Sequence, residues 1–318
     1  MSPLFVVFGF VLMVFGADYF VKGAVNIANR LGLPPLIIGL TIVAWGTSMP
    51  ELAVSLSAAG KDADEGTGLA LGNLIGSNIA NVFLIGGVGA LMLPLACPPK
   101  QLRRDALWLT VATIFTIFIG ALGQLTAWFG ALLIGLLIVQ ATTLYLSVKE
   151  QENPGIETPS DLPASGGLFR AVAIFLGGLV AVVFGSELLV SHAILIAQQL
   201  QISGAVIGVT MVAVGTSLPE LVTTIAAARQ GQRDVIIGNI VGSNIANIVL
   251  VLGAVSLIAP GNIPSDLLDG DLWVMALSSG VFLSILLAAR TINRFWALIF
   301  LGVFALYVAW QFKFFGLL

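Results

Sequence analysis

Apolar stretches long enough to cross a membrane occupy most of this chain. Of its 318 residues, 58% are hydrophobic and only 9% are charged, a balance that excludes an ordinary water-soluble globular protein. Because a membrane-spanning helix needs about 20 residues, the chain has room for about ten spans and for no separate soluble domain. The expected spans are residues 3–24, 36–59, 69–93, 106–122, 127–148, 168–190, 205–228, 235–258, 272–289 and 295–312.

One long polar segment divides these spans into two groups of five. It covers residues 149–167 and reads KEQENPGIETPSDLPASGG, with the proline, glycine and charged residues that are typical of linkers. The sequence therefore predicts a first repeat over residues 1–148, a linker over residues 149–167 and a second repeat over residues 168–318. The expected fold class is an all-α integral membrane protein with ten transmembrane helices.

Two motifs occur once in each half. GLTIVAWGTSMPEL at residues 39–52 matches GVTMVAVGTSLPEL at residues 208–221 in ten of fourteen positions, and GNLIGSNIAN at residues 72–81 matches GNIVGSNIAN at residues 238–247 in eight of ten. Because each half has an odd number of spans, the second copy must be upside down relative to the first. Such inverted-topology repeats place a substrate near the membrane midplane, between broken helices.

The first motif places a glutamate well inside a span in each half, at Glu51 and Glu220. A charged side chain at that depth costs about 2.5 to 3.5 kcal/mol, so it needs a cation as partner. The proline directly before each glutamate breaks the helix and frees carbonyl oxygens. Thr47 and Thr216 lie four residues before the glutamates, so hydroxyl, carbonyl and carboxylate oxygens can converge on one helix face. Such an all-oxygen site suits a hard cation such as calcium.

The second motif adds a stripe of polar side chains at every fourth position, which lines one face of a helix. The glycine pairs Gly72/Gly76 and Gly238/Gly242 allow another helix to approach closely. The stripe residues, which we expect to join the cation site, are Asn73, Ser77, Asn81, Asn239, Ser243 and Asn247. With one histidine and one cysteine, the chain cannot form a Cys/His metal cluster, and no cofactor is expected.

Structural roles are the competing interpretation of these residues. A proline with Ser and Thr in a membrane helix often produces only a kink, and Asn or Ser stripes often form only hydrogen bonds between helices. The duplication of an isolated glutamate argues against a purely structural role for Glu51 and Glu220. Asp18 and Glu187 also align between the repeats, but near the ends of their spans they are expected to be interfacial residues.

The two motifs, G-T-S-x-P-E-L and G-N-x-x-G-S-N-I-A-N, are each present twice and resemble the alpha repeats of the sodium/calcium exchanger family, in the cation/calcium exchanger superfamily. The resemblance covers the whole chain. It implies that Glu51 and Glu220 bind calcium together with backbone oxygens near Thr47 and Thr216. It also implies sodium sites shaped by Ser48, Ser77, Asn81, Ser217, Ser243 and Asn247, with the carbonyl groups of Ala44 and Ala213 contributing.

One departure from the family pattern concerns Asn247. Several members carry an aspartate in the second motif, and that aspartate is associated with potassium dependence in the branch that cotransports potassium. The asparagine makes potassium coupling unexpected and leaves the ion stoichiometry open.

These features together predict a secondary antiporter that exchanges sodium for calcium by alternating access. Two glutamates balance one calcium ion or two sodium ions, so the ions compete for shared ligands. A proton-coupled or broader-specificity divalent-cation antiporter is the alternative that the neutral asparagines leave open. An inverted repeat with central helix breaks disfavours a channel, and an enzyme is disfavoured because Ser48 and Ser217 have no His or Lys base in their motif. The resemblance further implies that the first and sixth spans slide across the core.

Lysine and arginine residues orient the chain, because cytoplasmic loops carry an excess of both. Eleven of the thirteen fall on one side of the expected spans and two, Lys61 and Lys313, on the other. This split predicts that both termini face outside and that the linker is cytoplasmic. No basic run suited to nucleic acid is present. The expected partners are the lipid bilayer and the transported calcium and sodium ions, with no nucleic acid or protein partner.

The predicted topology can be tested at the single cysteine, Cys97. We expect a membrane-impermeant thiol reagent to label this residue only from the cytoplasmic side, because the loop after the third span belongs to the side rich in Lys and Arg. Labelling of intact cells is compared with labelling of inverted membrane vesicles, with Cys97→Ala as the background. Labelling from outside in intact cells would contradict the topology.

Overall fold

The computed structural model describes residues 2–59, 63–96, 99–151, 167–200, 213–264 and 267–314. Within these ranges the protein is helical apart from four two-residue strands and short turns and connections, and nine helical segments are long and apolar enough to cross a membrane. The seventh expected span, residues 205–228, is described only from residue 213, so the count of ten remains a prediction. The expected linker lies mostly outside the described residues, as do Cys97 and Lys61, and the repeat boundaries at 148 and 168 also remain predictions.

The helices follow the expected spans, several of which consist of consecutive shorter elements. The first half contains α1 (Ser2–Leu31), α2 (Pro35–Ile38), η1 (Gly39–Val43), α3 (Ala44–Thr47), α4 (Met49–Ala59), α5 (Ala63–Ala80), η2 (Asn81–Ile85), α6 (Gly86–Met92), α7 (Pro99–Leu122) and α8 (Ala127–Gln151). The second half contains α9 (Leu168–Gln199), α11 (Ala213–Thr216), α12 (Leu218–Arg229), α13 (Arg233–Ala246), η4 (Asn247–Leu252), α14 (Gly253–Ile258), η5 (Leu267–Asp271), α15 (Leu272–Ala289) and α16 (Arg294–Phe314).

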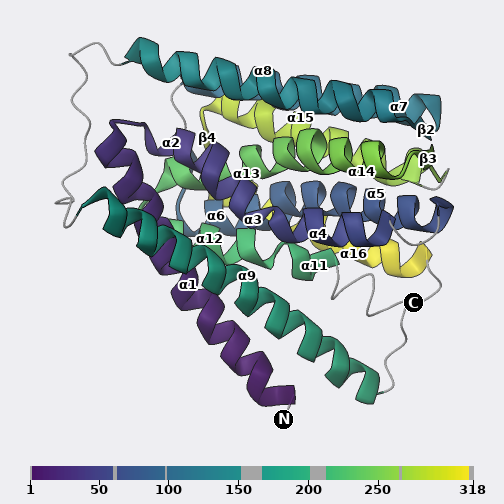
Figure 1. Ribbon diagram of the computed structural model, residues 1–318, viewed down its shortest axis with the longest axis horizontal. Coiled ribbons are helices and arrows are strands. Elements are labelled where there is room, and N and C mark those ends of the chain that lie inside the picture. Colours follow the sequence, from purple (N-terminus) through teal and green to yellow (C-terminus); the bar gives the residue numbers. More distant parts are fainter. Residues whose placement is uncertain are drawn as a thin grey trace.

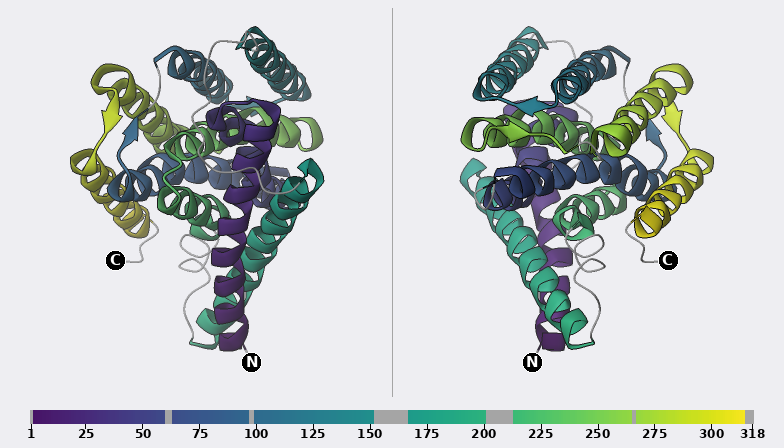
Figure 2. Two further views of the ribbon diagram at one scale, coloured as in Figure 1. Left: turned by 90° about the vertical axis from the view of Figure 1, so that its left-hand side faces the viewer. Right: turned by 90° about the vertical axis from the view of Figure 1, so that its right-hand side faces the viewer.

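The helices α1 and α9 are longer than the sequence predicts. They have 30 and 32 residues, because the polar residues that end each apolar stretch do not end the helix. At 1.5 Å per residue each helix is about 45 Å long, well beyond the hydrocarbon core of about 30 Å. The two helices run side by side in opposite directions, cross the other helices obliquely and protrude beyond them (Figure 1, Figure 2).

Glycines allow the backbones of α1 and α9 to approach each other closely. A Cβ atom added at Gly178 would lie 2.7 Å from the Cα atom of Phe20, and one added at Gly185 would lie 2.8 Å from the backbone nitrogen of Met13. The glycines of this contact recur every seven residues, at Gly9, Gly16 and Gly23 on α1 and at Gly178 and Gly185 on α9. The contact therefore has few interlocking side chains.

The second motif forms the centre of the protein. Of the 18 most apolar consecutive residues in the span Arg233–Ile258, 94% are buried inside the protein. The corresponding share is 11% in the peripheral span Arg294–Gln311. The helix α13 packs against the first half, where a Cβ atom added at Gly238 would lie 2.7 Å from the carbonyl oxygen of Leu36. This close approach is the one expected for the glycine pair of α13. The matching pair on α5 makes no such contact with the described residues.

Two short antiparallel ladders join the halves at the helix ends. The strand β1 (Leu95–Ala96) pairs with β4 (Thr291–Ile292), and β2 (Gln124–Leu125) pairs with β3 (Gly261–Asn262). Each ladder takes one strand from each half. The sequence does not predict these strands, because two residues are too few to carry a strand periodicity.

The close contact between α1 and α9 predicts unequal effects at two adjacent glycines. Replacing Gly178 by alanine should lower the thermal unfolding midpoint in detergent, because overpacking costs about 1–3 kcal/mol. The matched control is Gly177→Ala, since an added Cβ atom there meets nothing within 4 Å. Alanine favours the helix equally at both positions, so the difference between the variants isolates the contact. Equal midpoints would contradict this packing.

Candidate cation site

Each buried glutamate follows an interruption of its helix. Ser48 separates α3 from α4 with φ −83° and ψ 5°, and Ser217 separates α11 from α12 with φ −88° and ψ 4°. Both serines therefore lie in the sparsely populated bridge region of backbone conformation. The proline two residues later lies in the first turn of the following helix, where its missing N–H is tolerated. The broken helices expected from the sequence are thus present in both halves.

The glutamates lie in the first turn of α4 and α12, where the helix dipole favours a negative charge. Their spacing, Ser-x-x-Glu, is also that of a capping box, in which Glu51 would accept a hydrogen bond from the backbone N–H of Ser48. That N–H donates instead to the carbonyl oxygen of Ala44 at 3.0 Å. Ser217 likewise makes no side-chain capping bond. Helix capping therefore does not account for the paired glutamates.

Both carboxylates are buried without a basic partner. Glu51 is 0% and Glu220 is 1% exposed, and their charges are close enough to interact. Neither carboxylate oxygen of Glu51 has a hydrogen-bond partner, nor does Oε2 of Glu220. Ser48 donates a hydrogen bond to the other oxygen of Glu220 at 3.2 Å, which links the two halves. No lysine or arginine among the described residues pairs with either glutamate, so their charge can be balanced only by a bound cation or by protonation.

Reciprocal hydrogen bonds cross between the halves next to the glutamates. The hydroxyl of Thr47 donates to Oδ1 of Asn239 at 3.3 Å, and the hydroxyl of Thr216 donates to Oδ1 of Asn73 at 3.2 Å. The amide nitrogen of each asparagine donates to the backbone carbonyl oxygen of the glutamate in its own half, at 3.4 Å for Asn73 and 3.3 Å for Asn239. These asparagines therefore hold each glutamate backbone against the threonine of the opposite half.

Four asparagines form a second crossed arrangement, each of them at most 1% exposed. The amide nitrogen of Asn81 donates to Oδ1 of Asn244, and that of Asn247 donates to Oδ1 of Asn78, both at 3.0 Å. The side-chain oxygens (Oδ1) of Asn81 and Asn247 have no hydrogen-bond partner. Two neutral oxygens are thereby left free to bind a cation.

The π-helical turns η2 and η4 begin at Asn81 and Asn247. A π-turn inserts an extra residue into the helix and is often found at functional sites. The motif sequence, read at an α-helical spacing, does not predict these turns. Their positions at matched residues indicate that both halves use the same distortion to place the asparagine side chain.

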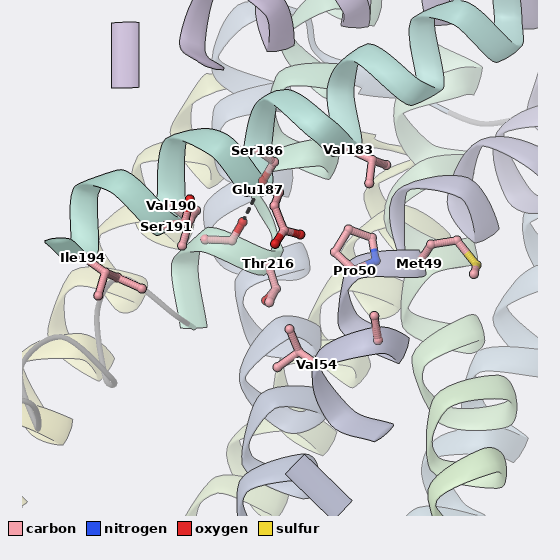
Figure 3. Close-up of a pocket in the computed structure, with 12 residues that line it drawn as sticks. Met49, Pro50, Val54, Val183, Ser186, Glu187, Val190, Ser191, Ile194 and Thr216 are labelled. Atoms are coloured by element: carbon pink, nitrogen blue, oxygen red, sulfur yellow. Dashed lines mark hydrogen bonds between the residues drawn. The ribbon is translucent and has the colours of Figure 1, made fainter. Parts of the chain in front are cut away.

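The two halves differ in one contact at the helix break that precedes the glutamate. Ser186 on α9 donates a hydrogen bond to the carbonyl oxygen of Gly215 at 3.2 Å (Figure 3). This carbonyl lies four residues before Pro219 and is the one that the missing proline N–H frees. Ala17 occupies the matching position on α1 and has no hydroxyl. The helix α9 is thus tied to the break in the second half by a bond that α1 cannot make.

The predicted site residues mostly lie together, although their roles as ion ligands remain predictions. Ser77 lies 3.4 Å from the hydroxyl of Thr216, whereas its counterpart Ser243 has no partner. The carbonyl oxygen of Ala44 lies 3.2 Å from the hydroxyl of Thr47, whose single proton it shares with Oδ1 of Asn239. Ala213 is the first described residue of α11. The buried hydroxyl of Ser217 has no partner.

Sequence reasoning missed several side chains that hold the site. Asn78 and Asn244 stand in both copies of G-S-N, and this duplication was the available signal. Ser55 and Thr224 accept hydrogen bonds from the amides of the first asparagine in each motif, at 3.0 and 3.3 Å. They also align between the halves. Ser186 gave no signal, because its counterpart is alanine.

The fold and the candidate site define a multi-pass membrane protein in which two buried glutamates lie among neutral polar side chains, between two matched halves. The family model described as sodium/calcium exchanger protein matches residues 1–146 and 170–313. The chain belongs to this family, which is a family of transporters.

Relatives agree with this assignment over nearly the whole chain. The sodium/calcium exchanger MaX1 of Methanosarcina acetivorans is 36% identical over 293 residues, covering 81% of this chain and 83% of the relative. The inner membrane protein YrbG of Escherichia coli is 37% identical over 291 residues, covering 89% and 87%. A solved structure of the sodium–calcium exchanger NCX_Mj has a TM-score of 0.83 at 30% identity and covers 97% of both chains.

From the hydrogen bond between Asn78 and Asn247 we predict that Asn78 affects cation binding, although it is hydrogen-bonded to neither glutamate. Asn78→Leu leaves the amide of Asn247 unpaired, which costs about 1–3 kcal/mol and frees it to turn its NH₂ toward the cation. We expect calcium to raise the thermal unfolding midpoint less in this variant than in the wild type. The control is Thr113→Val, which removes a buried hydroxyl bonded only within α7. An unchanged calcium-induced shift in Asn78→Leu would contradict this positioning role.

Proposed function

We propose that this protein exchanges sodium for calcium across the membrane by alternating access. The observation that carries the proposal is the set of buried oxygen atoms without partners, on Glu51, Glu220, Asn81 and Asn247. Buried polar atoms are nearly always paired, and here the unpaired ones include two carboxylates. A transported cation supplies the missing partner.

The charge of the site determines which ions it accepts. Two carboxylates balance one calcium ion or two sodium ions, so loading with one species displaces the other. Among the described residues, no three His, Cys, Asp or Glu side chains lie close enough together to hold one metal ion. The remaining ligands are therefore neutral oxygens of serine, threonine, asparagine and the backbone, which hard cations prefer. The relatives that are sodium–calcium exchangers support the same ion pair.

Two asparagines provide a place for a third sodium ion, in addition to the two that the carboxylates balance. Asn81 and Asn247 offer neutral carbonyl oxygens, which can take a further sodium ion without releasing a proton. A third sodium ion would make exchange move net charge, worth about 2.3 kcal/mol per elementary charge per 100 mV. Exchange is therefore expected to respond to the membrane potential. We further propose that the chain performs no catalysis and that both termini face outside.

The proposal is tested by calcium flux in proteoliposomes under imposed sodium, potassium or proton gradients. Glu51→Gln and Glu220→Gln should each abolish sodium-driven calcium uptake while the protein stays folded, because the change removes a buried charge and keeps the side-chain shape. Uptake driven by protons and not by sodium would favour the alternative of a proton-coupled or broader-specificity divalent-cation antiporter.

The matched control is Asp105→Asn. Asp105 is also buried, at 6% exposure, but it lies in α7 and pairs with Arg104 at 2.8 Å. This variant should retain sodium-driven uptake. Loss of uptake in the two glutamine variants would then be due to the position of the removed charge and not to its burial. Near-normal exchange in either glutamine variant would overturn the assigned site.

A further inference from the structure

A cavity of about 470 Å³ opens between α9, α4 and α11, beside the central site. Its walls are mainly apolar, and Met49, Pro50 and Val190 are among them. Glu187 is the one charged side chain among the residues that line it. The close-up shows its carboxylate directed into the cavity, toward Thr216 and Pro50 (Figure 3). The sequence predicts an interfacial residue at this position and does not predict that its side chain lines this cavity.

Glu187 differs from its counterpart in the first half. Asp18 on α1 lies 3.7 Å from Arg229, and the side chain of Gln230 donates to its backbone carbonyl oxygen at 3.2 Å. Glu187 is exposed and forms neither an ion pair nor a hydrogen bond with the described residues. An ionisable side chain inside a membrane protein usually has a function, and this one is available to a cation.

The cavity and the central site share Thr216. Thr216 lines the cavity and also donates to Asn73 and contacts Ser77 in the cation site. Ser186, the neighbour of Glu187, is bonded to Gly215 at the helix break. Glu187 and Thr216 line the same cavity, and Thr216 is hydrogen-bonded to residues of the proposed transport site.

We propose that Glu187 forms an access site, in which a partly hydrated cation binds before it passes Thr216 into the central site. The proposal rests on the proposed function, because the cation is the transported one. One carboxylate in a roomy cavity leaves the ion most of its water, so binding is weak and exchange is fast. Its main effect is to raise the local cation concentration, more for a divalent than for a monovalent ion.

The first test measures the local charge without transport. In a Cys97→Ala, Ser191→Cys background, the single thiol lies in the cavity wall. The modification rates by a cationic and an anionic thiosulfonate of similar size are compared in the purified protein. Adding Glu187→Gln should lower the cationic-to-anionic rate ratio by roughly threefold or more at low ionic strength, and salt should diminish the difference.

Two matched variants complete this test. Glu187→Asp should keep most of the ratio because it keeps the charge. Asp18→Asn removes the same charge from the matched position in the other half and should leave the ratio unchanged. A ratio that Glu187→Gln does not alter, or that Asp18→Asn lowers equally, would overturn the access site even if the protein exchanges sodium for calcium.

The second test uses calcium uptake in proteoliposomes. Glu187→Gln should raise the calcium concentration for half-maximal uptake roughly three- to tenfold at low ionic strength, with the maximal rate retained. A lost maximal rate with an unchanged half-maximal concentration would overturn the proposal and place Glu187 in the central machinery. Absence of exchange in the wild type would refute the proposed function instead, and the thiol rates would still decide the access site.

Discussion

The two buried carboxylates without a basic partner impose the main constraint on this structure. Glu51 and Glu220 are held at the start of half-helices, where backbone dipoles favour their charge, but the protein leaves most of their oxygens without hydrogen bonds. A protein that changes its access side with this site empty would carry two charges through a low-dielectric interior. In the proposed exchange this penalty favours a change of access side in the loaded state, which would couple the movement of one ion to that of the other.

The surrounding helices are arranged to keep this site in place. Each helix break is supported by an asparagine from the same half and a threonine contact from the other. Neither half is complete alone, because Ser48 of the first half donates to Glu220 and Thr216 of the second half donates to Asn73. The crossing of contacts explains why both motifs are duplicated. It also places the site at the interface and not within one repeat.

Much of this arrangement could be predicted from the sequence, because membrane spans appear as long apolar stretches and repeats appear as duplicated motifs. The helix α15 has the expected bounds, and α8 begins at the expected residue. The glutamates were identifiable from the cost of burying charge. Contacts that depend on three-dimensional placement left weaker traces. The π-turns at Asn81 and Asn247 have no sequence signature, and the cavity at Glu187 depends on where α9 lies against α4 and α11.

The short ladders between the halves are held by backbone pairing, unlike the side-chain contacts around the glutamates. They are held by main-chain hydrogen bonds, so the identity of exposed side chains such as Gln124 and Asn262 is immaterial to them. Proline is the exception, because it has no N–H to donate. Substitutions of the exposed residues at these helix ends should therefore leave the ladders intact, whereas a side chain added at the glycines between α1 and α9 would push the two backbones apart.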